Sequence, residues 1–388
     1  MRKRVFSLLV SGASLLAGTG ELSPAWAEGA PSAATGDAAG QTGQTDPAAD
    51  PESARLNEID KTYRAKLAQT LGASADPRDW ALASLITGAQ TELARSLHTR
   101  AADAPGDALV QWIVLSQSSA RSASAVADAD ALTRLQAIEA GNASVWMYAL
   151  MRAAQLHDAG AIDEAMRHMA ASTYTDEHWY DAQKALIEVF KRNPPPDEYF
   201  ALASSAQSTP GTESLTRESW PYFASVAIVA AMPLPAYQSL ANACKPRADF
   251  QPGAARIGDC AKTGRTMAAK GNTLVANRIG FTLLRVTHAY NDDDVRLARA
   301  QDWIWEKSIG LYADTSRLPS AAKLIARVDD QNATGNELEA MRRELVREGL
   351  PTEPPADWID TRSPFSAERL RADETALTPK SNRAPPAP

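Results

Sequence analysis

Apolar residues recur at helical spacing through most of the chain. They step by three and four positions along residues 82–97, at Leu82, Leu85, Ile86, Ala89, Leu93 and Leu97, and so share one helix face. The same spacing recurs over residues 146–156, 182–190 and 274–286, and three consecutive prolines end the third of these four segments. The sequence contains no convincing run of alternating apolar and polar residues. The pattern therefore predicts an all-α fold.

Both ends of the chain lack this spacing. Residues 28–53 are mostly Ala, Gly, Thr, Gln, Pro and Asp, which bury little apolar surface, so they predict a disordered leader. Residues 350–388 include two Pro-rich stretches and predict a mostly disordered tail. Between them we expect a helical repeat region over residues 54–210 and a C-terminal helical region over residues 211–349.

The first 27 residues have the three parts of a signal peptide. Basic residues 2–4 precede an apolar segment, residues 5–17, which is too short to span a bilayer. Residues 25–27, Ala-Trp-Ala, match the small-x-small pattern of a cleavage site, so we expect cleavage before Glu28. This predicts a periplasmic protein, exported by a Sec-type rather than a twin-arginine route, with secretion as an alternative.

Charge narrows the classes of partner. The formal net charge is −7, and loss of the basic signal peptide makes the chain more acidic. An acidic chain without a basic stripe does not attract nucleic acid. No stretch after the signal peptide is apolar for long enough to span a membrane.

Tryptophans recur with a regular period. Trp80, Trp112, Trp146 and Trp179 follow one another at intervals of 32, 34 and 33 residues. Periods of this length are typical of helix-turn-helix repeats that stack into a solenoid, because one pair cannot bury its own apolar face.

The segment 142–172 resembles a tetratricopeptide repeat. In that resemblance Ala153 and Leu156 are the small and large packing residues of the first helix, Gly160 makes the turn, and Ala165 and Met169 pack from the second helix. Trp146 lies about three residues before the usual aromatic position of the family, and the closing proline is absent. The resemblance implies stacked antiparallel helix pairs over about residues 78–208. The whole chain is also similar to uncharacterised exported helical proteins of Gram-negative bacteria, which implies no activity.

The two cysteines, Cys244 and Cys260, are the only ones in the chain. In an oxidising compartment an isolated pair predicts a disulfide, here closing a Pro- and Gly-containing loop between two helices. The alternative is a redox-active pair, but catalytic thiols are usually two residues apart.

Three groups of residues are candidates for a metal or catalytic site. His157, His168 and His178 have acidic neighbours, as zinc ligands do, but their spacing matches no known zinc site. Glu218 stands in a Glu-Ser pair like that of exported lytic transglycosylases, without the Gly-Leu-Met-Gln segment of those enzymes. Residues 291–294 (Asn-Asp-Asp-Asp) lack the glycine and glutamate of an EF-hand and predict a helix cap. We therefore expect no catalytic, cofactor or metal site.

The sequence leaves three functions open. The first, which we favour, is a periplasmic helical-repeat protein that binds an unknown protein or peptide in the concave groove of its solenoid. The second is a cell-envelope enzyme acting on peptidoglycan, with Glu218 as its acid. The third is a structural helical protein without a dedicated ligand.

Overall fold

The computed structural model of the chain describes residues 51–87, 91–104, 106–118, 125–206, 215–233, 237–247, 250–312, 320–366 and 369–370. In these residues the structure has sixteen helices and no strand. The helices are α2 (Pro51–Gly72), α3 (Pro77–Thr87), α4 (Glu92–Ala102), α5 (Ala108–Ser118), α6 (Ala125–Ile138), α7 (Ala143–Gln155), α8 (Ala159–Ala171), α9 (Trp179–Arg192), α10 (Asp197–Ala206), α11 (Trp220–Ala230), α12 (Tyr237–Cys244), α13 (Ala254–Lys270), α14 (Leu274–Val286), α15 (Asp292–Gly310), α16 (Ala321–Thr334) and α17 (Glu337–Arg347). The predicted all-α fold is confirmed. The predicted signal peptide and nearly all of the predicted leader lie outside the described residues.

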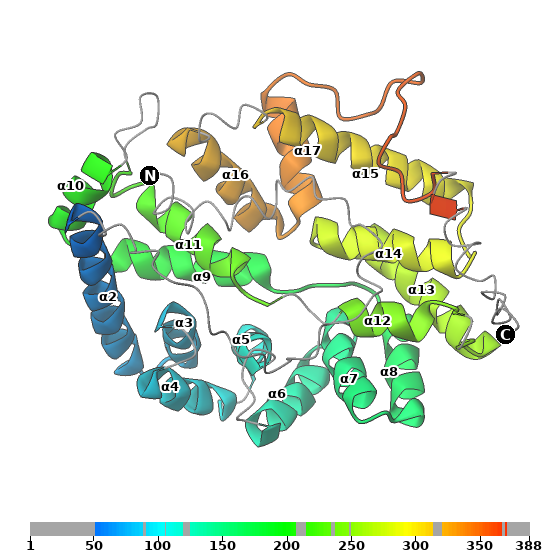
Figure 1. Cartoon of the computed structure of the whole chain (residues 1–388), viewed down its shortest axis with the longest axis horizontal. Coiled ribbons are helices and arrows are strands. Elements are labelled where there is room, and N and C mark those ends of the chain that lie inside the picture. Colours follow the sequence, from blue (N-terminus) through cyan, green and yellow to red (C-terminus); the bar gives the residue numbers. More distant parts are fainter. Residues whose placement is uncertain are drawn as a thin grey trace, which may run out of the picture.

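Consecutive helices pack as pairs along the first half of the chain. The pairs are α3 with α4, α5 with α6, and α7 with α8. In Figure 1 they follow one another in an arc, with α2 at one end. Further along the chain α13 pairs with α14 and α16 with α17, while α8 packs against α13. The predicted repeat region and C-terminal region are therefore in direct contact.

Helix α9 crosses the middle of the molecule. It packs against α3 and α5 on one side and against α11 and α16 on the other (Figure 1). Its buried face includes Leu186, Val189 and Phe190, which join the same apolar core as Leu82 and Trp112 from the helix pairs. The chain's own α9 thus covers faces of α3 and α5.

The four periodic tryptophans lie near the N-terminal ends of alternate helices, α3, α5, α7 and α9. Only Trp112 is fully buried; Trp80, Trp146 and Trp179 are half-buried at the edges of apolar clusters. Their period therefore coincides with the succession of helices, although their environments differ.

The best repeat unit differs in part from the resemblance. Ala153, Ala165 and Met169 are buried between helices, as a packing role requires. Leu156 is instead 70% exposed. Helix α7 ends at Gln155 and Leu156 is its C-cap residue, so the assignment of a packing role to Leu156 is wrong.

The turn of this unit also differs from the prediction. His157 adopts a left-handed backbone with φ of 54°, and Asp158 caps α8 by accepting a hydrogen bond from the backbone N–H of Ala161. Gly160 lies within the first turn of α8 rather than in the loop. The reversal is therefore made by residues 156–158, and the role given to Gly160 is corrected.

The two cysteines lie at disulfide distance, as the sequence predicts. Cys244 ends α12 and Cys260 lies within α13, and their Cα atoms are 5.8 Å apart. Both are fully buried among apolar residues of α7, α8 and α14. The bond therefore lies inside the contact between the first and second halves of the chain.

The predicted disordered tail is partly ordered. Residues 350–366, here called the strap, pack along α14 and α15, with Phe365 buried and Trp358 against Trp303. Proline prevents regular helix here but does not prevent packing, because the strap carries aromatic anchors. Residues 371–388 of the predicted tail lie outside the described residues.

None of the described helices combines the length and the apolar character that crossing a bilayer requires.

Candidate functional site: the loop junction around His178

Four helices begin at one place in the molecule. The segment 172–178, which joins α8 to α9, pairs with the loop before α7 through Asn142 and Tyr174 and with the loop before α14 through Thr175 and Gly271. The loop before α17 joins them, because the N–H of Glu337 donates to the carbonyl of Asn272. We call this meeting of loops the junction. The N-terminus of a helix carries partial positive charge, so the junction favours acidic side chains.

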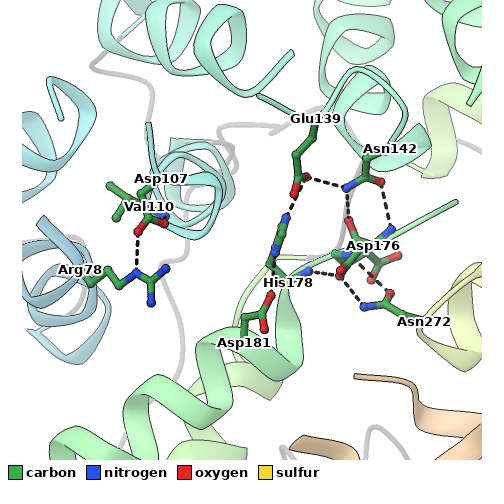
Figure 2. Close-up of polar contacts among 10 residues, drawn as sticks. Arg78, Asp107, Val110, Glu139, Asn142, Asp176, His178, Asp181 and Asn272 are labelled. Atoms are coloured by element: carbon green, nitrogen blue, oxygen red, sulfur yellow. Dashed lines mark hydrogen bonds and ion pairs between the residues drawn. The ribbon is translucent and has the colours of Figure 1, made fainter. Parts of the chain in front are cut away.

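Two asparagines hold the junction together (Figure 2). The side-chain Oδ1 of Asn142 accepts from the backbone N–H of Ser144 and of Asp176, at 3.1 and 2.9 Å. Its amide nitrogen donates to the Glu139 carboxylate and to the Asp176 carbonyl, both at 2.9 Å. Asn272 accepts from the N–H of Glu177 and donates to the Asp176 carboxylate. Asn142 therefore caps α7 and also fixes a segment 34 residues further along the chain.

His178 lies between two carboxylates. Its Nδ1 is 2.9 Å from Asp181 Oδ2, and its Nε2 is 2.9 Å from Glu139 Oε2. Figure 2 shows the imidazole between them. Burial alone would lower the pKa of His178, but the hydrogen bonds to Asp181 and Glu139 outweigh it and raise that pKa to about 10. Both ring nitrogens therefore donate, and the ring is an imidazolium at neutral pH.

The pKa values of the two carboxylates that flank His178 shift in the opposite direction to that of the histidine. Burial works to raise the pKa of Glu139, but the hydrogen bond from His178 prevails and the pKa is lowered. The same hydrogen bond lowers the pKa of Asp181. The three groups form a charged bridge between the residue that follows α6 and the N-terminus of α9.

A second set of acids lies deeper in the junction. Glu177 is fully buried, and burial raises its pKa to about 8, although the hydroxyl of Thr273 acts to lower it. Glu337 is also buried, and its Oε2 accepts from the backbone N–H of Leu274 at 2.9 Å. Burial raises the pKa of Glu337 as well. Glu337 thus caps α14 from the start of α17.

Three of these side chains could hold a metal ion. Ligand atoms of Asp176, His178 and Asp181 lie within 4.8 Å of one another. Zinc binds neutral imidazole nitrogen and carboxylate oxygen, so it would have to displace the proton that His178 shares with Asp181. With both ring nitrogens bonded to carboxylates, the described geometry is that of an ion bridge.

The histidines singled out in the sequence are not brought together. His157 lies in the exposed turn before α8, and His168 stacks on Trp146 with ring centroids 3.8 Å apart. Only His178 enters the junction. The residues that sequence reasoning missed are Glu139, Asp181, Asn272 and Glu337, whose only sequence signal is a position at or near a helix end.

The other candidates lie elsewhere. Glu218 is exposed just before α11 and away from the hydrogen bonds of the junction. Asn291 caps α15 together with Asp294 in a capping box, so the predicted helix cap is confirmed. Both described hydrogen-bond partners of the His178 ring are carboxylates. A serine- or cysteine-type triad instead needs a hydroxyl or thiol nucleophile bonded to the histidine.

Apolar side chains are exposed beside the junction. Ile138 is 43% exposed and Tyr174 is 37% exposed, and Trp146 is half-buried. The Trp146 Nε1 donates to the carbonyl of Ala140 at 3.0 Å, and the Tyr174 ring lies beside Gly141. We call Ile138, Trp146 and Tyr174 the aromatic surface.

In comparisons with known proteins, no family model, no curated protein and no solved structure matches this chain.

Proposed function

We propose that this chain is an exported, non-catalytic helical-repeat protein that binds a protein or peptide partner through the aromatic surface. The observation that carries the proposal is the exposure of Ile138 and Tyr174 around the α6–α7 loop, where Trp146 bonds to the carbonyl of Ala140. Tyrosine and tryptophan are enriched at protein interfaces, where they bury much area at small entropic cost. Stacked tetratricopeptide-like pairs over α3 to α8 are part of the same proposal.

The loops that carry this surface are held rigidly. The N–H of Ala143 donates to the carbonyl of Tyr174 at 2.9 Å, and Asn142 uses all of its amide hydrogen-bonding groups on neighbouring residues. A surface that is already ordered loses little conformational freedom on binding. The charged bridge at His178 therefore supports binding by positioning rather than by contact.

We infer that the partner binds to the aromatic surface rather than in a concave groove. Helix α9 already packs against α3 and α5 and occupies that face of the helix pairs. The aromatic surface instead lies around the end of α6, the start of α7 and the loop before α9, and none of its residues belongs to the apolar core that contains the buried face of α9. This changes the location, but not the class, of the function expected from the sequence.

Site-specific crosslinking tests this function. A photoreactive phenylalanine analogue at position 174 should give a discrete adduct in the periplasm of the producing cell. The matched control is the same analogue at position 359, where Ile359 is 78% exposed on the strap. The adduct at 174 should disappear when Ile138 is replaced by serine. Equal labelling from both positions, or none from 174, would contradict the proposal.

A further inference from the structure

The strap is fixed mainly through its backbone carbonyls. Arginines of α14 and α15 donate to them: Arg278 to the carbonyl of residue 362, Arg285 to that of residue 364, and Arg299 to those of residues 355 and 358. In Figure 1 the strap is the orange-to-red trace that leaves α17 and passes α15. Apart from its aromatic anchors, few strap side chains are buried. Near the centre of the strap lies half-buried Asp360, whose Oδ2 atom is shielded from solvent.

Asp360 lies close to a buried carboxyl group of α15. Asp302 of α15 is only 3% exposed, and its Oδ1 accepts a hydrogen bond from Arg278. Asp360 of the strap uses its Oδ1 to accept from the backbone N–H of Arg362 at 3.1 Å. The Oδ2 atom of each is buried and accepts no hydrogen bond from any donor among the described residues. Arg278 brings the two side chains together, because it donates both to Asp302 and to the carbonyl of Arg362, whose own N–H donates to Asp360.

Two facing carboxylates without a donor repel each other, whereas one shared proton turns the contact into a hydrogen bond. Burial is the main cause that raises the pKa of Asp302, to about 7; Arg278 acts to lower it and Asp360 to raise it. The proton is thus retained in a pH range where an exposed aspartate has lost it.

Among the described residues, one cation is bonded directly to this pair. Arg278 donates to Asp302 from α14, whereas Arg362 of the strap reaches Asp360 only through its backbone N–H. The Arg362 guanidinium lies over the ring of Trp305 on α15, 4.7 Å from its centroid, and its Nη1 is buried without an acceptor in the described residues. Arg278 also lies over this ring. Arg278 reduces the repulsion between the ionised carboxylates without supplying a proton between the Oδ2 atoms.

We propose that the strap is a pH-dependent latch, closed on α14 and α15 by a carboxyl–carboxylate hydrogen bond between Asp302 and Asp360 and loosened when the shared proton is lost. Because the closed state binds this proton more tightly than the open state, opening becomes more frequent as pH rises. The increase is at most tenfold per pH unit, between the ordinary aspartate value of about 4 and about 7. Above about 7 the opening should become independent of pH.

Hydrogen exchange followed by mass spectrometry tests the latch in the mature protein. The observable is the protection factor of peptides covering the strap, corrected for the intrinsic pH dependence of exchange, between pH 5 and pH 8. In the wild type we expect protection to fall by tenfold or more. Peptides from α13 should not change in parallel, because a parallel change would report global unfolding and would overturn the latch.

The key variant is Asp302→Asn, whose amide donates to Asp360 at any pH. It should keep the strap protected at pH 8 and remove the pH dependence. Asp357→Asn is the matched control, since Asp357 is exposed on the same strap and should behave like the wild type. Should the first variant not fold, Asp360→Asn supplies the same donor from the other side. Unchanged wild-type protection across the pH range, or the same decrease in the amide variant, would refute the proposal.

Discussion

Replacing His178 with glutamine removes the only cation of the bridge between α6 and α9 while leaving a side chain of similar reach. Glu139 then lies mostly buried without its charged donor. Removal of one partner from a buried ion pair costs about 3–5 kcal/mol, because an uncompensated charge remains. We expect the variant to fold but to be clearly less stable than the wild type near neutral pH.

The pH dependence follows from the direction of the shift. The pKa of His178 is raised in the folded state to about 10, so its stabilisation is complete below pH 6.5 and is lost as pH rises towards 10. At about 1.4 kcal/mol per pKa unit the full rise corresponds to about 5 kcal/mol. Asp181 is 58% exposed, and solvent screening weakens its share, so we expect about 3 kcal/mol at pH 6. At pH 9 the difference should be about 1 kcal/mol.

Urea unfolding of both proteins at pH 6, 7.5 and 9 measures this difference as a change in the free energy of unfolding. Below about pH 4.5 the difference should shrink again, because the lowered pKa values of Glu139 and Asp181 confine their contribution to higher pH. Taking the difference between the two proteins removes titrations that both share, including that of Glu177.

His157→Gln is the matched control. His157 has the same left-handed backbone as His178, with φ of 54° against 52°, but its side chain is exposed. Any cost of placing glutamine at positive φ therefore appears in the control as well. A destabilisation of His178→Gln that matches the control, or that is the same at pH 6 and pH 9, would refute the charged bridge.

Three further predictions concern other parts of the chain. Gly280→Ala should destabilise the protein by about 2–3 kcal/mol, because a Cβ there would clash with a backbone nitrogen of α13. Gly258→Ala should stabilise it by about 0.5–1 kcal/mol, because a Cβ there meets no atom within 4 Å. Thermal unfolding of both variants measures these changes. Replacing Cys244 and Cys260 with alanine should lower the free energy of unfolding by about 3 kcal/mol, and peptide mapping without reduction should find the two wild-type peptides joined. Mass spectrometry of the exported protein should find Glu28 at the N-terminus.

Local chemistry in the sequence predicted local structure well. Helical spacing gave the fold class, and Asn291 was recognised as a cap because capping depends on residues three positions away. Leu156 shows the limit of this reasoning. A shift of one residue in the end of a helix determines whether an apolar side chain lies on the buried face or in the turn. Spacing alone cannot locate that end to within one residue.

The strap and the junction show why the remainder was not predictable. Proline content correctly indicated that residues 350–366 are not regular helix, but Trp358 and Phe365 could pack only if α14 and α15 offered a surface. Likewise, Asn142 is recognisable as a cap, whereas its bonds to Asp176 depend on a loop 34 residues away. Such contacts depend on tertiary packing, which cannot be deduced from local spacing or from composition.

The acidic character of the junction has one physical explanation that links these observations. Four helices begin there, and each N-terminus favours negative charge by about 0.3–1 kcal/mol. Glu337 uses such a terminus directly, through the N–H of Leu274. The compensation is incomplete, because burial still raises the pKa of Asp176 and of Glu177. His178 is therefore needed as an imidazolium, and its two carboxylate partners need it in turn. We expect the loops beneath the aromatic surface to be less stable when this balance of charge is disturbed, which would tie the proposed binding surface to the protonation state of the groups below it.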